Sequence, residues 1–337
     1  MTSHRMTNRA ITRRALLAAG AAGAAAATLG GWPARARAAT PVALQLSWLH
    51  SVQFAGSYIA RARGYWSEAG LDVALLQGGP NAPVEPPVVT GAALVGISAA
   101  DYTAAAVAQG APFRIIGVAM QKNPFVIASL PAAPVNAPAD LIGKRLGMAT
   151  ANMPVLQALC SLNGLDIGGI EVIPTQYSAQ PLLAGEVDCL LCWETDLPVA
   201  MAMQGVESVT MLLADHGYAL HSQTYIATEE SLANRRAELV GLMAGELRGW
   251  EAYRQDTDAA ARLTVEAFPD AGLDLPSQEM QAARQVPLMF PEAGEGRAFG
   301  SWTDEAVAQN IRTLALLGRE VGPELWDRSI LDEIHGG

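Results

Sequence analysis

Short apolar runs alternate with amphipathic stretches through about two hundred residues that follow position 38. The runs are four to six residues long and rich in Val, Ile and Leu, which predicts buried strands, and the stretches between them predict helices. Alternation of this kind is typical of βαβ units and favours mainly parallel sheets. The predicted strands are 42–46, 72–76, 94–97, 114–119, 145–148, 171–174, 187–191 and 209–213. The helices predicted between them include one from near Ala55 to Gly64, and 101–109, 139–142, 154–162 and 180–185.

The pattern changes after residue 228. Apolar residues recur there at spacings of three and four, without a strand-like run, and this predicts a helical C-terminal tail. Thr228 before Glu229, and Ser301 to Asp304, are typical helix starts. The predicted tail helices are 229–254, 257–268, 277–289 and 303–317.

Two extended segments predict that the chain crosses twice between two lobes. One is MQKNPFVIASL at 120–130, and the other is YALHSQTYIAT at 218–228. About 300 residues exceed what one hydrophobic core usually spans, which also favours two lobes. We therefore expect an outer lobe of residues 39–125 and 225–337, with an inner lobe of 126–224 inserted into it.

The first 38 residues have the features of an export signal. A twin-arginine pair in TRRALL is followed by a weakly hydrophobic Ala- and Gly-rich run, and Ala36-Arg37-Ala38 precedes the expected cleavage point. The alternative is an N-terminal membrane anchor. Cleavage would release a soluble protein into the periplasm, since nothing after residue 38 is apolar for long enough to cross a bilayer.

Charge and cysteine content narrow the function classes. Residues 1–38 hold six of the 22 basic residues and none of the 33 acidic ones, which leaves 16 against 33 and a formal net charge of −17. This acidic balance argues against nucleic acid and anionic membranes as partners. Three cysteines, Cys160, Cys189 and Cys192, do not make an even disulfide set, and Cys189 and Cys192 point to opposite faces of a predicted strand. We expect buried free thiols, and no metal site.

Three segments resemble solute-binding proteins of ABC importers, in the group that includes thiamine-pyrimidine, aliphatic sulfonate, taurine and nitrate binders. The segments are FAGSYIARARGYWSEAGLDVALLQGG at 54–79, VGISAADYTAAAVAQGAPFRIIGVAMQKNPFVIASL at 95–130 and ADLIGKRLGM at 139–148. The resemblance implies a type II periplasmic-binding-protein fold in the α/β class, with the ligand clamped between the lobes. It also implies a membrane permease as partner, a monomer, and no cofactor.

In such a fold the carboxyl ends of the strands face the cleft, so position along the chain selects the candidate ligand-binding residues. A helix N-terminus after Ser98 suits an anion or a carbonyl oxygen, although Ser98 and Asp101 there are also ordinary helix-start residues. The candidates are Trp48, His50, Gln53, Ser98, Asp101, Tyr102 and Asn123 from the outer lobe, Thr150, Asn152, Tyr177, Trp193 and Glu194 from the inner lobe, and Tyr225 on the return crossing.

The tryptophans and the glutamate among these candidates indicate what kind of ligand could bind. Trp48 and Trp193 each follow a strand, where a flat ring could stack on them, although either could instead pack beneath a loop. The inner-lobe segments near the cleft carry Glu194 and no Lys or Arg, which disfavours an anion and favours a neutral or cationic heterocycle such as an aminopyrimidine. The alternative, a sulfonate, taurine or nitrate, requires Lys122 or Arg114 to reach the cleft.

An enzymatic reading is disfavoured. The same superfamily contains an enzyme that forms the thiamine pyrimidine from its own histidine and carries a Cys-rich motif. Here CLLCWETD at 189–196 lacks that cluster, and the histidine position corresponds to about Phe54. Common hydrolase, nucleotide and zinc-protease motifs are also missing, so we expect a binding protein without catalytic residues.

Overall fold

The computed structural model describes residues 38–79, 81–291 and 298–336. The predicted export signal, residues 1–38, therefore lies outside the described residues except for its last position. No helix in these three stretches is long and apolar enough to cross a membrane.

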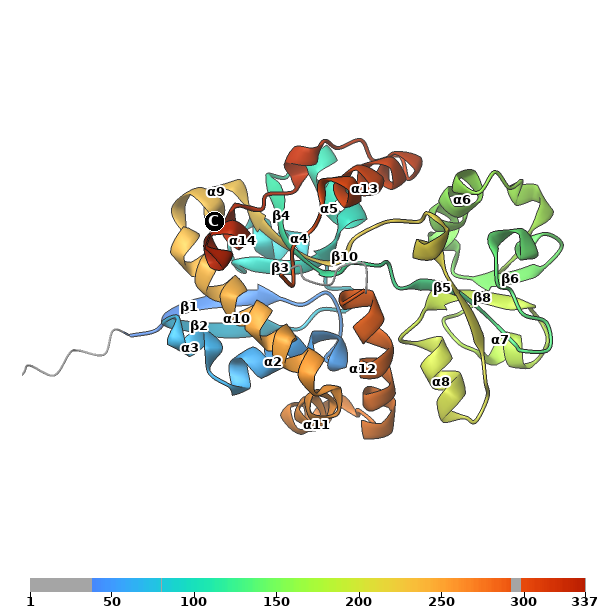
Figure 1. The fold of residues 1–337 in the computed structure, drawn as a ribbon, viewed down its shortest axis with the longest axis horizontal. Coiled ribbons are helices and arrows are strands. Elements are labelled where there is room, and N and C mark those ends of the chain that lie inside the picture. Colours follow the sequence, from blue (N-terminus) through green and yellow to red (C-terminus); the bar gives the residue numbers. More distant parts are fainter. Residues whose placement is uncertain (1–37, 80, 292–297, 337) are drawn as a thin grey trace, which may run out of the picture. The chain divides into compact units, whose positions relative to one another are not determined.

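The first of two five-stranded sheets is built mainly from the N-terminal part of the chain (Figure 1). Its order is β2-β1-β3-β10-β4, with β1 parallel to β2 and β3, and β10 antiparallel to both of its neighbours. All seven residues of β10 are buried, as expected for a central strand. Its strands are β1 (Thr40–Gln45), β2 (Leu71–Leu76), β3 (Val95–Ala99), β4 (Phe113–Met120) and β10 (Ser222–Thr228).

The second sheet is formed by a continuous part of the sequence between β4 and β10. Its order is β7-β6-β8-β5-β9, with β6 parallel to β7 and β8, and β5 antiparallel to β8 and β9. The chain thus passes between the sheets twice, and we call the parts built on the first and second sheets the outer and inner lobes. The strands are β5 (Phe125–Ser129), β6 (Arg145–Met148), β7 (Glu171–Pro174), β8 (Cys189–Trp193) and β9 (Val209–Leu212).

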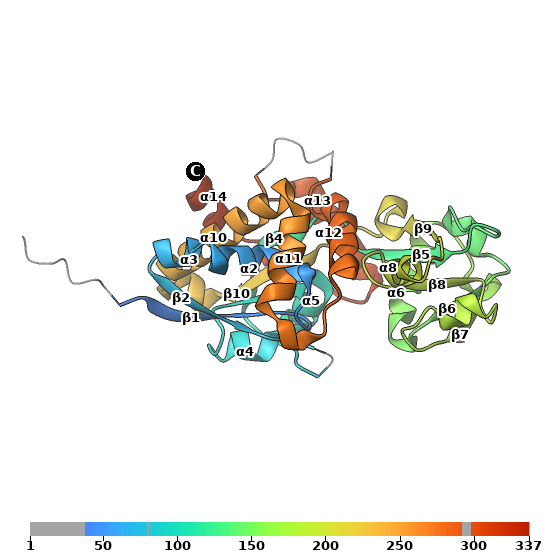
Figure 2. The same cartoon turned by 90° about the horizontal axis from the view of Figure 1, so that it is seen from below.

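Helices cover both sheets, and the C-terminal helices belong to the outer lobe, where α12 and α13 lie on the side toward the inner lobe (Figures 1 and 2). Helix α12 contacts α8, and α13 contacts α6, so both pairs join the lobes. The outer-lobe helices are α2 (Ala55–Ala62), α3 (Tyr65–Glu68), α4 (Glu85–Val89), α5 (Ala100–Ala108), α9 (Glu229–Asn234), α10 (Arg236–Gln255), α11 (Thr257–Ala267), α12 (Leu275–Met289), α13 (Asp304–Leu316) and α14 (Ser329–His335). The inner-lobe helices are α6 (Met153–Leu162), α7 (Gln180–Leu183) and α8 (Leu197–Met203).

Short 3₁₀ turns connect these elements. The predicted helix at 139–142 is one of them, and the predicted helix 229–254 is interrupted at Arg235 between α9 and α10. They are η1 (Val52–Phe54), η2 (Pro138–Leu141), η3 (Thr150–Asn152), η4 (Ile167–Gly169), η5 (Leu213–His216), η6 (Pro269–Ala271) and η8 (Pro323–Leu325).

The eight predicted strands are all present, and the two-lobe α/β fold with its helical tail is confirmed. Both extended segments of the predicted crossings also became strands, β5 and β10. The three cysteines are free and buried. Cys189 packs in a cluster on one face of β8 and Cys192 in the cluster on the other, as the alternation of a strand requires.

Helices α2 and α10 pack closely because glycines face each other. A Cβ atom on Gly249 would lie 2.0 Å from the carbonyl oxygen of Gly56, and one on Gly56 would lie 2.3 Å from the Trp250 ring. This approach lets the fully buried Trp250 fill the space between α10 and the sheet.

Candidate functional site

The loop after β1 carries Trp48 and is fastened from several sides. His50 stacks on Phe268, with ring centroids 3.8 Å apart, and its Nδ1 lies 3.0 Å from the Tyr58 hydroxyl. Burial, and then the positive charge of Arg61, lower the pKa of His50, which keeps the imidazole neutral at pH 7. His50 therefore holds the loop in the outer lobe, while Trp48, two positions before it, remains 46% exposed.

The inner lobe presents a second pair of aromatic rings. The Tyr177 hydroxyl donates to Asp196 Oδ2 over 2.7 Å and accepts from the backbone N–H of Trp193 at 3.2 Å. Burial of this hydroxyl, followed by the charge of Asp196, raises the pKa of Tyr177. The half-buried Trp193 packs edge-on against Phe125. Tyr177 is thus fixed at its hydroxyl, and its side chain remains 53% exposed.

Exposed aromatic residues are confined to the strand ends. Within the described residues, Trp48, Tyr102 and Tyr177 are the aromatic residues classed as exposed, with Tyr102 at 66%. Trp48 follows β1, Tyr102 lies in the first turn of α5 directly after β3, and Tyr177 follows β7. All three positions follow the carboxyl ends of parallel strands, where open α/β sheets bind ligands.

Three predicted site residues are engaged inside the protein instead. Ser98 is buried within β3 and donates to Glu85 Oε1 at 2.5 Å, so it does not cap α5. Asn123 is buried at the first crossing, where it donates to the Leu220 carbonyl and accepts from the Phe125 N–H, and thereby ties the two crossings together. Tyr225 has no exposed surface and donates to Glu246 in the outer-lobe core. We therefore do not retain it as a ligand contact, because burial separates it from any cleft.

Four other predicted residues lie at strand and helix ends. Thr150 is exposed and Asn152 half-buried in the turn before α6, and Gln53 is half-buried in η1. None of these three side chains makes a hydrogen bond within the described part of the chain. Asp101 is half-buried in the first turn of α5, and burial raises its pKa.

Glu194 is paired across the two lobes, which the sequence did not reveal. Its Oε1 accepts a hydrogen bond from Arg284 Nη1 of α12, and its Oε2 is buried with no hydrogen-bond partner among the described residues. The carboxylate charge is therefore balanced by a cation of the outer lobe. The inner-lobe segments indeed supply no Lys or Arg, but Arg284 of the outer lobe does supply a cation, so the argument against an anion that was drawn from the inner-lobe segments alone is weakened.

A cavity of about 720 Å³ adjoins this ion pair, within the usual range for small-molecule sites. A second ion pair, Lys122 to Asp215 at 2.6 Å, also borders it. Arg114, the other cation that an anion site was expected to use, pairs instead with Glu229 at the opposite end of β4. The cavity is lined by Lys122, Glu194, Ala202, Thr210, Leu212, Asp215, Met280, Ala283, Arg284, Pro287 and Leu288.

Arg284 could have been found from the spacing of residues in α12. Five of the cavity-lining residues, at 280, 283, 284, 287 and 288, recur at the three- and four-residue spacing of one helix face. Four of them are apolar, so Arg284 interrupts an otherwise apolar stripe. A charged residue in such a stripe indicates either a salt bridge or a ligand contact.

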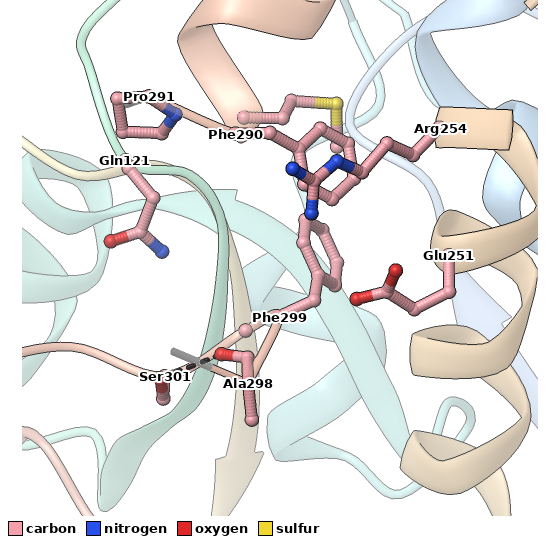
Figure 3. Close-up of a pocket in the computed structure, with 10 residues that line it drawn as sticks. Gln121, Glu251, Arg254, Phe290, Pro291, Ala298, Phe299 and Ser301 are labelled. Atoms are coloured by element: carbon pink, nitrogen blue, oxygen red, sulfur yellow. Dashed lines mark hydrogen bonds between the residues drawn. The ribbon is translucent and has the colours of Figure 1, made fainter. Parts of the chain in front are cut away.

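A second pocket, shown in Figure 3, is too small for a solute. Its volume of about 30 Å³ corresponds to roughly one water molecule. The Arg254 guanidinium lies 5.1 Å from the centre of the Phe290 ring there, and Ser301 donates to the Ala298 carbonyl. Within the described residues, no group of three or more His, Cys, Asp or Glu side chains could hold a metal ion.

Comparisons with known proteins define the class. Residues 51–260 match the family model described as NMT1/THI5 like. The structure is similar to the periplasmic aliphatic sulphonate binding protein SsuA of Escherichia coli, with a TM-score of 0.64 at 16% identity over 83% of this chain and 92% of that one. This likeness shows the fold alone. The chain belongs to the NMT1/THI5-like family and has the periplasmic-binding-protein fold.

Two curated relatives have different activities. The riboflavin-binding protein RibY of Chloroflexus aurantiacus is 27% identical over 260 residues, which cover 73% of this chain and 72% of that protein. The 4-amino-5-hydroxymethyl-2-methylpyrimidine phosphate synthase of Legionella pneumophila is 28% identical over 137 residues, which cover 40% of this chain and 41% of the enzyme. Both names refer to compounds with flat heterocyclic rings.

Proposed function

We propose that the protein is the substrate-binding component of an ABC importer and captures a small flat heterocycle, such as a thiamine pyrimidine, between its lobes. It acts in the periplasm as a monomer after removal of its export signal, and it delivers the ligand to a membrane permease. The exposed aromatic residues Trp48, Tyr102 and Tyr177 carry this proposal, since all three lie at strand ends of the two lobes. Aromatic faces without partners offer stacking area for a flat ring.

Binding couples to closure in this proposal. A ligand that touches Trp48 of the outer lobe and Tyr177 or Trp193 of the inner lobe stabilises the closed state relative to the open one. The chain crosses between the lobes at 121–124 and 217–221, and Asn123 links these crossings through the Leu220 carbonyl. These two segments are where hinge motion is expected. Gln53, Asp101, Thr150 and Asn152 supply polar contacts near the rings.

One relative and the charge of the cavity support a heterocycle as the ligand class. RibY is named for riboflavin, whose isoalloxazine ring system is flat, and it matches most of this chain. The balanced charge of the cavity, with two ion pairs, also favours a neutral ring over an anion. Riboflavin and an aminopyrimidine are therefore the first ligands to test.

An anionic solute is the second candidate, because Lys122 and Arg284 both border the cavity. In that case Lys122 must leave Asp215 to bind the sulfonate, and Lys122→Met abolishes binding. For a neutral ring, Lys122→Met changes affinity by less than about threefold, since exposed ion pairs contribute little.

A pyrimidine-forming enzyme is disfavoured by the environment of the residues it would need. Phe54, near the position of the enzyme's histidine, is fully buried, and Cys189 and Cys192 face opposite sides of β8. The synthase relative also matches less than half of this chain. We therefore propose binding without turnover.

A thermal-shift screen tests the proposal. The ligands are riboflavin, 4-amino-5-hydroxymethyl-2-methylpyrimidine, thiamine, taurine, ethanesulfonate and nitrate, each in large excess. Binding to the folded state alone adds about 2.7 kcal/mol at a hundredfold excess over Kd, which raises Tm measurably. We expect a shift with a flat ring, and its loss in Trp48→Ala and Tyr177→Ala but not in Val89→Ala. Val89 is an equally exposed apolar residue of α4 and serves as the matched control. A shift with taurine or ethanesulfonate alone contradicts the proposal.

A further inference from the structure

The ion pair between Arg284 and Glu194 leaves hydrogen-bonding capacity on both partners. Arg284 has five N–H donors, and its one described hydrogen bond uses Nη1 toward Glu194 Oε1. Glu194 Oε2 is buried and has no partner within the described residues. Both side chains line the cavity between the lobes. The pair therefore offers a carboxylate acceptor next to unused guanidinium donors.

Such a pair is complementary to one kind of ligand edge. An N–H group of a ring can donate to the carboxylate while an adjacent ring nitrogen or carbonyl accepts from the guanidinium. A simple anion meets Arg284 favourably but is repelled by Glu194 beside it. Each carboxylate oxygen can accept two hydrogen bonds, so the oxygen held by Arg284 can still accept one from a ligand N–H.

The surroundings of the pair suit a ring rather than an ion. Met280, Ala283, Pro287 and Leu288 form the rest of the α12 stripe and give the cavity an apolar wall. At another part of the lining, Lys122 and Asp215 neutralise each other over 2.6 Å. The cavity thus combines one apolar wall with charged groups that are paired with each other, and apolar walls with placed polar groups are typical of small-molecule sites.

Glu194 directly follows Trp193, whose backbone N–H is hydrogen-bonded to the Tyr177 hydroxyl, so the cavity adjoins the inner-lobe rings although none of the exposed rings of the described residues lines it. We infer that Arg284 and Glu194 are the specificity-determining pair for the proposed heterocycle. Together they select a flat ring that carries a hydrogen-bond donor next to an acceptor, and they exclude anions. This inference rests on the proposed function and adds to it the polar edge that the ligand must have. Because the two residues come from different lobes, only the closed protein can form hydrogen bonds from both of them to this edge of the ring.

Matched ligand pairs test the inference by isothermal titration calorimetry on the purified protein. One pair is riboflavin and 3-methylriboflavin, and the other is 4-amino-5-hydroxymethyl-2-methylpyrimidine and its 4-dimethylamino analogue. In each pair, methylation removes the N–H and keeps the ring. We expect the parent that binds to exceed its methylated partner by about 10- to 100-fold, the range of a hydrogen bond to a charged group.

The variants Arg284→Met and Glu194→Gln test whether this pair causes the difference in affinity between parent and methylated ligands and the exclusion of anions. In Arg284→Met the ratio between parent and methylated ligand falls below about threefold, since the carboxylate is no longer held toward the ring. In Glu194→Gln the affinity for ethanesulfonate rises by about tenfold or more, because Arg284 loses its counter-charge. Arg114→Met, which breaks the ion pair with Glu229, is the control and leaves both values unchanged. Circular dichroism verifies that each variant is folded.

The outcomes separate the two hypotheses. If neither parent ligand binds to the unmodified protein, the proposed function itself is wrong. If a parent binds and the ratio is the same in Arg284→Met, or if Glu194→Gln does not gain affinity for ethanesulfonate, the heterocycle site stands and the inference about the pair is overturned.

Discussion

The Tyr225 hydroxyl donates a hydrogen bond to Glu246 Oε2 over 2.8 Å in the fully buried core of the outer lobe. Trp250 Nε1 in turn donates to the same tyrosine oxygen at 2.7 Å. A candidate ligand contact is therefore part of a polar network in the core, which holds β10 against α10. The carboxyl group in this network has a consequence for stability.

Stability should fall as the pH rises toward neutrality because of Glu246. Burial raises the pKa of Glu246 from 4.5 to about 7, so folding favours its neutral form. The stabilisation is present below pH 4.5 and is lost as pH rises through 7, which amounts to about 3 kcal/mol. Urea unfolding at pH 5 and pH 8 measures it. Relative to Glu246→Gln, the free energy of unfolding of the unmodified protein should fall by about 2.5 kcal/mol between the two pH values, because part of the loss already occurs below pH 5. An equal change in both proteins would refute the assignment.

The contact between α2 and α10 predicts a sharp difference between two glycines of one helix. Gly249→Ala places a Cβ 2.0 Å from the Gly56 carbonyl oxygen and should lower the free energy of unfolding by about 1–3 kcal/mol or more. Gly241→Ala meets only side-chain atoms at 3.1 Å or beyond, and the higher helix propensity of Ala offsets the crowding by up to about 1 kcal/mol. Thermal unfolding of both variants compares them. Equal losses would show that the helices can separate.

The hydroxyl of Tyr177 should increase the affinity for a flat ring, because it orients the tyrosine ring that makes the proposed stacking contact. Tyr177→Phe removes the bonds to Asp196 and to the Trp193 N–H, so the ring loses its fixed orientation. We expect a loss of about three- to tenfold in affinity for the flat ring, corresponding to one hydrogen bond of modest net strength. Titration calorimetry gives the value. Tyr65→Phe, which removes an exposed hydroxyl near Arg63, should have no effect.

The three thiols should be unreactive in the folded protein. Cys160, Cys189 and Cys192 are buried, and burial raises the pKa of Cys189 to about 12, so little thiolate forms at pH 8. A thiol reagent such as dithionitrobenzoate should react with all three only after denaturation. Rapid reaction of the native protein would contradict their placement.

The fold was predictable because its signals are local and repeated. Apolar runs at 145–148 and 171–174 became strands with the same bounds, and the period of three to four residues marked the tail helices. The final helix α14 was missed, since its seven residues give too short a pattern.

The candidate site was predictable only in part. The exposed rings of Trp48, Tyr102 and Tyr177 were predicted from their positions just after strands. The sequence shows where each strand ends, because the order of strands and helices follows from local apolar patterns. The partners of Ser98 and Tyr225 lie 13 and 21 positions away on other elements, so they depend on tertiary packing. Glu194 and Arg284 are 90 positions apart, and the sequence between them carries no sign of their pairing. Only the interrupted apolar stripe of α12 pointed toward Arg284.

The central place of β10 predicts an order of folding for the two lobes. The outer sheet pairs β10 with β3 and β4, so it remains incomplete until residues 222–228 have been synthesised. The strands of the inner sheet, from β5 to β9, are contiguous in sequence and can assemble earlier. Pairing β10 with β4 closes a loop of about one hundred residues, which costs conformational entropy. A folded inner lobe holds the two ends of this loop closer together and so lowers that entropic cost. We therefore expect the inner lobe to fold first and the outer lobe to be completed when β10 pairs with β3 and β4.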